Sequence, residues 1–173
     1  MQILITGASG CGTSTLGQAL AAHLSWGCID LDDYYWVPTV PPFREKRDSA
    51  SRLARLQDEM ARHDDLVVSG SLMEWGIEVE NSFSLIVFLT VPAAVRVHRL
   101  ERREIQRYGI RDDAFLAWAA QYEEGTLPGR NRRRHEAWLA QRTCPILRID
   151  GTPTVSESLR IVLGQLVRPQ SGA

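Results

Sequence analysis

A glycine-rich segment, residues 7–15, carries the strongest chemical signal in the sequence. It reads GASGCGTST and matches the phosphate-binding pattern GxxxxGK[ST], except that Thr13 stands at the lysine position. Its glycines let backbone N–H groups turn inward around phosphate oxygens, with the positive end of a helix dipole behind them. The residues expected to contact a nucleotide here are Gly7, Ser9, Gly10, Cys11, Gly12, Thr13, Ser14 and Thr15. The lysine charge is missing, and the chain holds one lysine, Lys46, against 19 arginines.

Three aspartates, Asp30, Asp32 and Asp33, form a second candidate group at the end of a short predicted strand, residues 27–30. Open α/β sheets bind their ligands at this carboxyl edge. Carboxylates placed there can hold Mg²⁺ through water or accept a proton from an attacking hydroxyl group, and either role suits phosphoryl transfer. The alternative is that these aspartates only cap a loop or face solvent.

Strands and helices must alternate to position these groups. Apolar runs predict strands at residues 3–5, 27–30, 66–69, 85–91 and 146–149. Helix-period apolar residues predict helices after the glycine loop, after a cap at Asp48, over 93–106, on both sides of 125–129, and after residue 153. Three prolines exclude a helix over 36–43. Apolar strands alternating with helices predict an α/β fold with a mainly parallel five-stranded sheet covered on both faces.

Length and composition set wider bounds. A chain of 173 residues that is 44% hydrophobic fits one domain, 1–173. A net charge of -1 gives no general attraction to nucleic acid or to an anionic membrane. No run reaches the roughly 18 apolar residues of a membrane span and no basic leader precedes the first strand, so we expect a cytoplasmic protein. Three cysteines without CxxC spacing favour free thiols, and a monomer or a homodimer is expected.

In motif order, nearly the whole chain resembles the small P-loop kinases of the shikimate, gluconate and nucleoside monophosphate kinase superfamily, which are similar to adenylate kinase. The DxD of shikimate kinases is matched by Asp30 and Asp32, and the DDFY-like motif of uridine and nicotinamide riboside kinases by residues 32–35. Both alignments place the acceptor-side carboxylate at Asp32. The resemblance implies a P-loop three-layer α/β/α sandwich with strand order 2-3-1-4-5, an acceptor-binding region over about 32–65 and a helical lid over about 103–141.

The resemblance also implies the chemistry and its residues. ATP and Mg²⁺ would be the cofactors, and a small molecule, with a hydroxyl group favoured by the aspartates, would be the acceptor. The implied catalytic residues are Asp32, Arg103 and Arg133, with arginine supplying the charge that Thr13 lacks. The implied acceptor contacts are Asp32, Asp33, Arg44, Ser69 and Gly70. The metal contacts are Ser14, Asp30 and Asp32, and the further nucleotide contacts are Arg103, Gly151 and Pro153.

Two other functions stay open. A nucleoside monophosphate kinase would need a basic clamp, for which Arg44, Lys46 and Arg47 are candidates, and some cytidylate-kinase-like relatives similarly carry GTT in the loop. A nucleotide-binding regulatory module with little turnover is the other, because Ser69 stands where a Walker B aspartate would be expected.

The basic run at residues 130–135 is expected to serve the lid, with Arg130 and Arg134 on one helix face and Arg133 beside them. A nucleic-acid patch is disfavoured there because no aromatic residues are interleaved with the basic ones.

Overall fold

A computed structural model describes residues 1–40, 42–125 and 129–167. Pro41, residues 126–128 of the expected lid, and residues 168–173 lie outside the described residues. Within the described ranges, no helix combines the length and the apolar character needed to cross a membrane.

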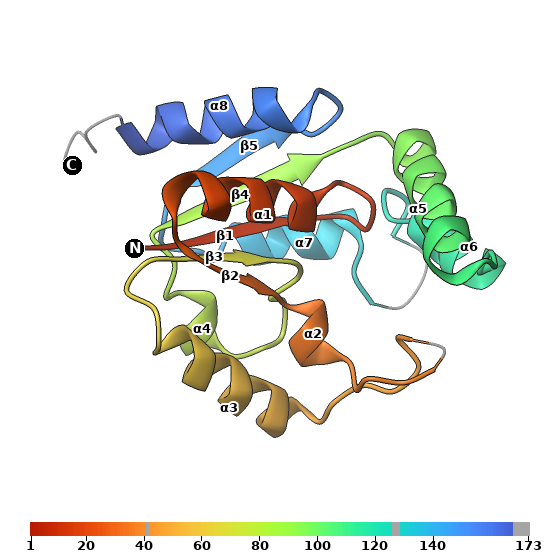
Figure 1. The fold of residues 1–173 in the computed structure, drawn as a ribbon, viewed down its shortest axis with the longest axis horizontal. Helices are drawn as coiled ribbons and strands as arrows, with labels where there is room; N and C mark the ends of the chain where they lie inside the picture. The colour runs from red at the N-terminus through yellow and green to blue at the C-terminus, as the bar shows by residue number, and fades with distance from the viewer. Residues whose placement is uncertain (41, 126–128, 168–173) are drawn as a thin grey trace.

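A parallel sheet of five strands forms the centre of the described chain (Figure 1). The strands are β1 (Gln2–Gly7), β2 (Gly27–Asp30), β3 (Leu66–Ser69), β4 (Leu85–Thr90) and β5 (Ile146–Asp150). Their order is β2-β3-β1-β4-β5, which confirms the predicted order, and every pair is parallel. Ile3 of β1 lies opposite Val67 of β3 and Leu85 of β4. The three-layer α/β/α sandwich is therefore confirmed.

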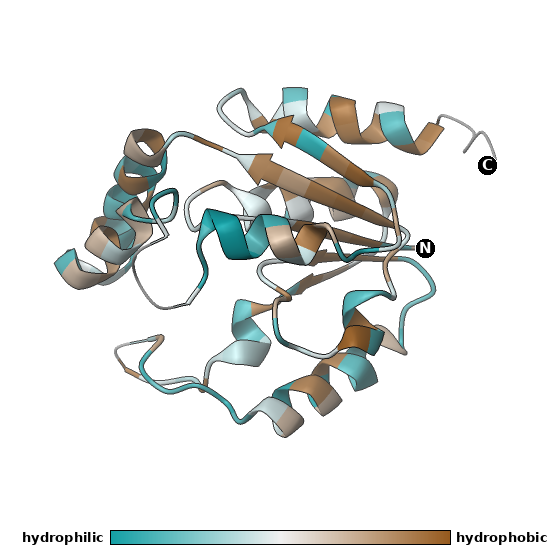
Figure 2. Ribbon diagram, turned by 180° about the vertical axis from the view of Figure 1, so that it is seen from behind, coloured by the Kyte–Doolittle hydropathy of each residue, from teal (hydrophilic) through white to brown (hydrophobic). Residues whose placement is uncertain are grey.

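Helices cover both faces of the sheet (Figure 1). One face carries α1 (Thr13–Leu24) and α8 (Val155–Val167), and the other carries α3 (Ser49–Met60), α4 (Ile77–Glu80) and α7 (Arg132–Leu139). The strands are the most apolar part of the fold (Figure 2). Successive residues of β1 serve opposite faces, because Ile3 and Ile5 pack with the first set of helices and Leu4 with the second.

Three helices stand at the carboxyl edge of the sheet. They are α2 (Asp32–Tyr35), α5 (Ala93–Tyr108) and α6 (Asp113–Ala120), with α5 and α6 beyond the ends of the strands (Figure 1). The single turn α2 was not predicted. Asp48 caps α3 as predicted, since its Oδ1 accepts a hydrogen bond from the backbone N–H of Ser51 at 2.9 Å.

The start of α7 corrects one prediction. Asn131 is its N-cap, with Oδ1 accepting from the backbone N–H of Arg134 at 2.9 Å. Arg130 therefore lies before the helix, and the expectation that Arg130 and Arg134 share a helix face is wrong. The physical reason is that the Asn131 cap starts the helix after Arg130 and frees the Arg130 side chain to take another direction.

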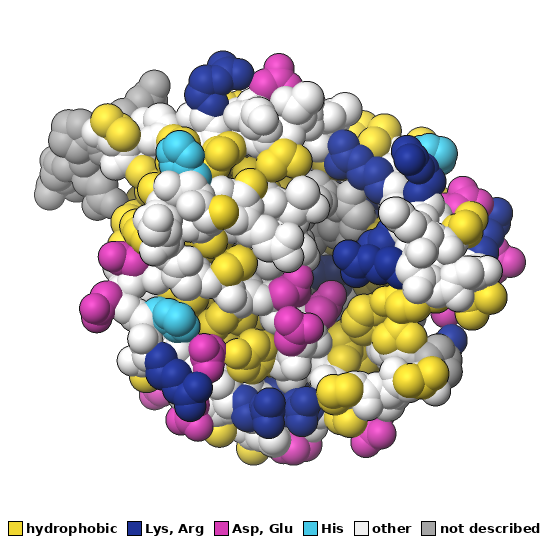
Figure 3. Space-filling view, in the orientation of Figure 1, with side chains coloured by type: hydrophobic (Ala, Val, Ile, Leu, Met, Phe, Trp, Pro, Cys, Tyr) yellow, Lys and Arg dark blue, Asp and Glu magenta, His cyan; other side chains and the backbone are white. Residues whose placement is uncertain are grey.

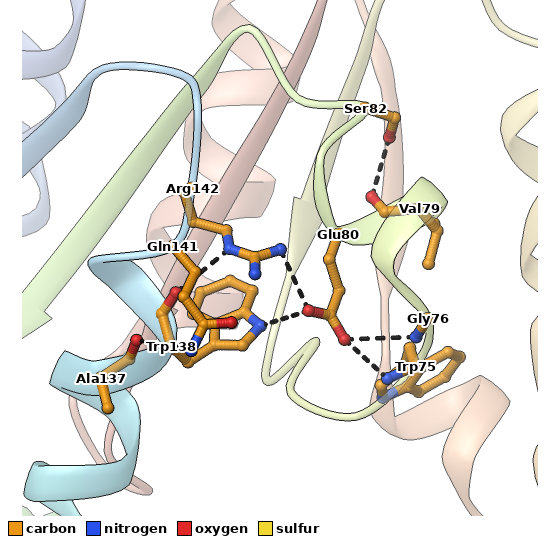
Figure 4. Close-up of polar contacts among 9 residues, drawn as sticks. All are labelled: Trp75, Gly76, Val79, Glu80, Ser82, Ala137, Trp138, Gln141 and Arg142. Atoms are coloured by element: carbon orange, nitrogen blue, oxygen red, sulfur yellow. Dashed lines mark hydrogen bonds and ion pairs between the residues drawn. The ribbon is translucent and has the colours of Figure 1, made fainter.

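A buried ion pair fastens α4 to α7 (Figure 4). Oε2 of Glu80 lies 3.0 Å from Nη1 of Arg142 and accepts a hydrogen bond from Nε1 of Trp138 at 2.7 Å. Its Oε1 accepts from the backbone N–H groups of Trp75 and Gly76 at 3.0 and 3.2 Å. The Arg142 contact is an ion pair without hydrogen-bond geometry, because neither Nη atom of Arg142, both of them buried, has a hydrogen-bond partner among the described residues. Glu80 is the single carboxylate that holds this network together.

Candidate functional site

The backbone of the glycine loop leaves little room for side chains. Gly10 and Gly12 have φ angles of 84° and 92°, which L residues with side chains rarely adopt. A Cβ on Gly7 would lie 2.6 Å from the carbonyl oxygen of Leu89, and one on Gly10 would lie 2.7 Å from that of Arg96. Gly12 precedes α1, whose N-terminus has no side-chain cap. The first N–H groups of α1 are therefore available to an anion.

Thr13 and Ser14 open α1, and both side chains are partly exposed. Ser14 therefore offers a hydroxyl oxygen beside the loop. Thr13 offers a hydroxyl group and a backbone N–H, but no charge.

Arg96, which the sequence analysis did not select as a site residue, anchors the loop from behind. Its side chain is fully buried on α5, and Nη1 donates to the carbonyl oxygens of Ser9 and Ala119 at 3.1 and 3.0 Å. Nε donates to the carbonyl of Val91 at 3.1 Å, and Nη2 binds Oε2 of Glu123 at 2.7 Å. The charge of Arg96 is thus balanced inside the protein. Its spacing from Leu100, four residues on and also buried, was the sequence signal for its inward direction.

A second arginine, Arg130, also contacts the loop. Nη2 of Arg130 donates to Oγ of Ser9 at 2.7 Å. The Arg130 side chain is partly accessible to solvent, and the surrounding protein lowers its pKa by desolvation, against the raising effect of Asp32. The two arginines therefore hold different atoms of Ser9.

Asp32 begins α2, at the carboxyl end of β2. Its backbone N–H donates to Oδ1 of Asp30 at 3.1 Å, so the two carboxylates lie close together. The side chain is accessible to solvent, yet neighbouring protein atoms remove part of its hydration. This desolvation, followed by the charge of Asp30, raises the pKa of Asp32, and Arg130 and Arg103 oppose the rise. Desolvation and Asp30 also raise the pKa of Asp33. A carboxylate whose pKa is raised is a better proton acceptor.

Both groups lie at the carboxyl edge of the sheet, the loop after β1 and the aspartates after β2. Figure 3 shows a hollow on this side of the molecule, with acidic side chains on one wall and basic side chains across from them, toward α5. We call residues 7–15 with Arg96 the P-loop side, and residues 30–35 with the segments that pack beside them the aspartate side. Arg130 touches the P-loop side and interacts electrostatically with Asp32.

The arginines predicted to serve the site differ in whether they lie close to Asp32. Arg103 is close enough to lower the pKa of Asp32, and its Nη2 also lies 3.2 Å from Oε1 of Glu104. Arg44 pairs with Asp112, the N-cap of α6, at 3.5 Å. Arg133 is exposed on α7 and has no ion pair with the described residues. The structure thus brings Arg103 and Arg130 to Asp32, and it does not bring Arg133 or Arg44 there.

The turn after β3 lies beside the aspartates. The hydroxyl of Ser69 is buried and donates to the carbonyl of Ile29 at 3.3 Å, which links β3 to β2. Gly70 has a φ of 120°, and a Cβ there would lie 3.0 Å from Cβ of Leu31. Ser69 therefore has a partner within the sheet, and the backbone of Gly70 needs glycine.

A pocket of about 350 Å³ opens on the other flank of the loop. Arg99 partly closes it by donating to the carbonyl oxygens of Gly151 and Thr152 at 3.1 and 3.4 Å. The residues lining it are Cys11, Gly12, Thr15, Leu16, Leu89, Arg99, Gly151, Pro153, Thr154, Val155 and Ser158. Gly151 and Pro153, which are expected from the sequence to contact a nucleotide, line this pocket together with Arg99, which was not selected from the sequence.

An aromatic group borders the aspartate side. The guanidinium of Arg52 lies between the rings of Tyr35 and Trp75, at 4.7 and 4.9 Å from their centroids. Its Nη2 donates to the carbonyl of Glu74 at 3.2 Å, while its Nε is buried without a hydrogen-bond partner. Glu74 also pairs with Arg134 of α7. Sequence reasoning missed this stack, because its members come from three separate segments.

A buried polar group joins β1 to α7. His135 is fully buried; its Nε2 lies 3.2 Å from Oγ1 of Thr6, and its Nδ1 lies 3.0 Å from the hydroxyl of Tyr122. Burial, helped by Arg130 and Arg148, lowers the pKa of His135 to about 3, so its ring is neutral at physiological pH. Thr6 directly precedes the glycine loop, so α7 and the loop share one rigid attachment.

No group of three or more His, Cys, Asp or Glu side chains suited to hold a metal ion occurs among residues 1–40, 42–125 and 129–167. Hard oxygen ligands are nevertheless present as the Ser14 hydroxyl and the carboxylates of Asp30 and Asp32. Mg²⁺ commonly uses one or two such ligands together with substrate phosphates. The donor set fits an ion that arrives with a nucleotide.

Comparison with known proteins shows the family of the chain. A family model described as an AAA domain matches residues 3–125. The chain belongs to this AAA domain family. The uncharacterized protein YqaC of Bacillus subtilis (strain 168) is 37% identical over 174 residues, covering 95% of this chain and 96% of YqaC.

Solved structures share the fold. A shikimate kinase from Bacteroides thetaiotaomicron superimposes with a TM-score of 0.57 at 23% identity, covering 96% of this chain and 98% of that one. A gluconokinase from Sinorhizobium meliloti 1021 gives 0.59 at 21% identity, over 96% and 91% of the two chains. A deoxyadenosine kinase from M. mycoides gives 0.61 at 12% identity, over 96% and 98%. The chain therefore has the fold of the small P-loop kinases, as the sequence predicts.

Proposed function

We propose that this protein transfers the γ-phosphoryl group of ATP to a hydroxyl group of a small molecule. The observation that carries the proposal is that Arg130 donates to Ser9 of the phosphate-binding loop and also interacts electrostatically with Asp32. The loop amides would hold the phosphates, and the pocket beside Arg99 and Pro153 would hold the base. The likeness of fold to shikimate kinase, gluconokinase and deoxyadenosine kinase supports a kinase reaction.

The reaction requires one bond to form and one to break. The acceptor oxygen attacks the γ-phosphorus, the bond from that phosphorus to the β,γ-bridging oxygen breaks, and ADP leaves. The acceptor proton passes to the carboxylate of Asp32, whose raised pKa suits this role. When Mg²⁺ is bound with ATP, it supplies positive charge on the phosphates, with Ser14 and Asp30 or Asp32 as its protein ligands. Arg103 would add charge at the transferring group.

The two sides of the hollow would bind different parts of the substrates. Asp33, Gly70 and the rest of the region 32–65 would contact the acceptor. The described parts of 103–141 would cover the phosphates as a lid.

The contacts of three basic residues favour a hydroxyl acceptor over a nucleoside monophosphate. Arg44 pairs with Asp112, and Arg47 donates to the carbonyl oxygens of Tyr34 and Trp36 at 3.2 and 3.3 Å. Lys46 lies over the ring of Tyr35, 5.9 Å from its centroid. A clamp on an acceptor phosphate would have to break these contacts.

The test has two steps. Thermal shift with ATP, with and without Mg²⁺, measures nucleotide binding, and ADP release is then measured with nucleosides, nucleoside monophosphates, sugars and hydroxy acids. We expect ATP to stabilise the fold and one hydroxyl class to raise ADP release. An absent ATP shift would refute the kinase proposal. ATP binding without any productive acceptor would instead support a nucleotide-binding regulatory module.

A further inference from the structure

Residues 7–15 carry no positively charged side chain, and the sequence alone does not show which basic residue lies close to them. Thr13 is neutral, and the one lysine of the chain, Lys46, lies over the Tyr35 ring on the aspartate side. An ATP polyphosphate carries several negative charges, which loop amides and a helix dipole balance only in part. A cation from elsewhere in the chain must reach the loop if ATP is to bind tightly there.

Among the described residues, the guanidinium groups of Arg96 and Arg130 hydrogen-bond to the loop, and they differ in their access to solvent. Arg96 is fully buried, and its Nε, Nη1 and Nη2 all have protein partners, one of which is the carboxylate of Glu123. If the Arg96 side chain turned toward a phosphate, the Glu123 carboxylate would lose its partner and three hydrogen bonds to backbone carbonyl oxygens would break. Arg130 is partly accessible and has one hydrogen bond to the described residues, at Oγ of Ser9. Arg130 is therefore the one of these two arginines whose side chain keeps contact with solvent.

The position of Arg130 suits the group being transferred. It touches Ser9 of the loop, where the donor phosphates would lie, and it interacts with Asp32, where the acceptor hydroxyl would lie. The planar guanidinium can hold two phosphoryl oxygens at once, which an ammonium group cannot do with the same geometry.

The chain also holds Arg130 in place. Asn131, the next residue, is buried and caps α7, and the backbone N–H of Arg132 donates to the carbonyl of Tyr122 at 2.8 Å. Farther along α7, His135 contacts Thr6, the residue before the loop. These contacts connect the segment of Arg130 to β1, the strand that precedes the loop. The Arg130 segment should therefore lose little conformational entropy when a nucleotide binds.

We propose that Arg130 takes over the role of the P-loop lysine, binding the donor phosphates beside Ser9 of the loop and stabilising the charge of the transferring group. This inference rests on the proposed function and makes Arg130 a catalytic residue of that reaction. It also explains why Thr13 is tolerated: the loop needs one cation near the phosphates, and Arg130 fills that place.

Exchange of charge between the two positions tests the proposal. The variants are Arg130→Gln, Thr13→Lys and the double variant Arg130→Gln/Thr13→Lys, with Arg160→Gln, an exposed arginine of α8, as the matched control. Titration calorimetry measures the affinity for ATP with Mg²⁺, and circular dichroism with thermal melting checks that each variant folds. We expect Arg130→Gln to weaken ATP binding by about 10- to 100-fold, the range for hydrogen bonds to charged groups.

The double variant shows whether Arg130→Gln weakens ATP binding through the lost charge or through a change in structure. Thr13→Lys should restore most of the affinity in the Arg130→Gln background and add little to the wild-type chain. ATP binding by Arg130→Gln at wild-type strength would overturn the inference, as would a folded double variant that regains no affinity. A wild-type chain that binds no ATP would instead refute the proposed function itself.

Discussion

The two walls of the hollow are built in different ways. The P-loop side is a continuous stretch of backbone whose shape is set by close contacts, such as the space at Gly10 that no Cβ could enter without meeting Arg96. The aspartate side is assembled from α2, α3, the segment before α4 and α7, held by side chains such as Arg52, Glu74 and Glu80. Many kinases bind the same phosphate groups, so one fixed backbone loop can serve as their site. Acceptors differ between kinases, and a wall held by side-chain contacts can change by substitution.

The largest expected effect concerns the support of the aspartate side. Glu80→Gln removes the charge that balances Arg142 in the interior and leaves a buried guanidinium unpaired. We expect the free energy of unfolding to fall by about 3–5 kcal/mol, measured by urea denaturation. The double variant Glu80→Gln/Arg142→Met should recover part of the loss because no unpaired charge remains. A loss below about 1 kcal/mol would show that the network does not support this wall.

The second effect tests the P-loop side. Gly10→Ala forces a Cβ to 2.7 Å from a backbone oxygen at a φ of 84°. Left-handed strain and overpacking should together lower the free energy of unfolding by about 2–4 kcal/mol, and ATP binding should be lost.

Gly109→Ala is the control for Gly10→Ala. Its φ of 70° is similar, but no atom lies within 4 Å of the new Cβ, so only strain of about 1–2 kcal/mol is expected, with ATP binding kept. Equal stability losses in the two alanine variants would contradict the close-packing account of the loop.

The third effect concerns the link between the walls. His135 is neutral in the fold because its pKa is lowered to about 3, whereas in the unfolded chain it titrates near 6.5. As the pH falls below about 6.5, His135 binds a proton in the unfolded chain but not in the folded chain. The free energy of unfolding therefore decreases between about pH 6.5 and about pH 3. At pH 5 the loss from this group is about 2 kcal/mol.

Urea denaturation at pH 7.5 and pH 5 measures this loss in the wild-type chain and in His135→Gln. Glutamine keeps hydrogen-bonding groups but does not titrate, so the variant should lose less stability on acidification. Identical losses in both proteins would mean that His135 is not the group responsible.

The smallest effect is expected where the walls meet at the surface. Arg44 and Asp112 form an exposed pair at 3.5 Å between the loop after α2 and the cap of α6. Arg44→Ala should change the free energy of unfolding by less than about 1 kcal/mol, and the difference should shrink further in 1 M salt. A loss of several kcal/mol would show that this contact, and not the buried networks, joins the two walls.

The same contrast explains what the sequence could predict. The glycine loop, the strands and their order follow from local patterns and from a resemblance that covers nearly the whole chain. Asp32 could be placed at the carboxyl edge of the sheet because it lies two residues after the end of β2. The direction of Arg130 was missed, although Asn131 as a helix cap was readable. The pairing of Glu80 with Arg142 and of His135 with Thr6 joins residues far apart in sequence, and nothing in the local pattern indicates either contact.

The most direct test of the account is phosphoryl transfer followed with γ-labelled ATP and Mg²⁺, in the wild-type chain and in Asp32→Asn, with the hydroxyl acceptor that gives the highest ADP release. The account predicts that label moves to the acceptor and that Asp32→Asn slows this transfer by a factor on the order of 10²–10⁴. Binding of ATP without Mg²⁺ should be nearly unchanged, because Asp32 lies after β2 and outside the phosphate-binding loop. Transfer by Asp32→Asn at the wild-type rate, or a wild-type chain that binds ATP and passes label to no hydroxyl compound, would contradict it.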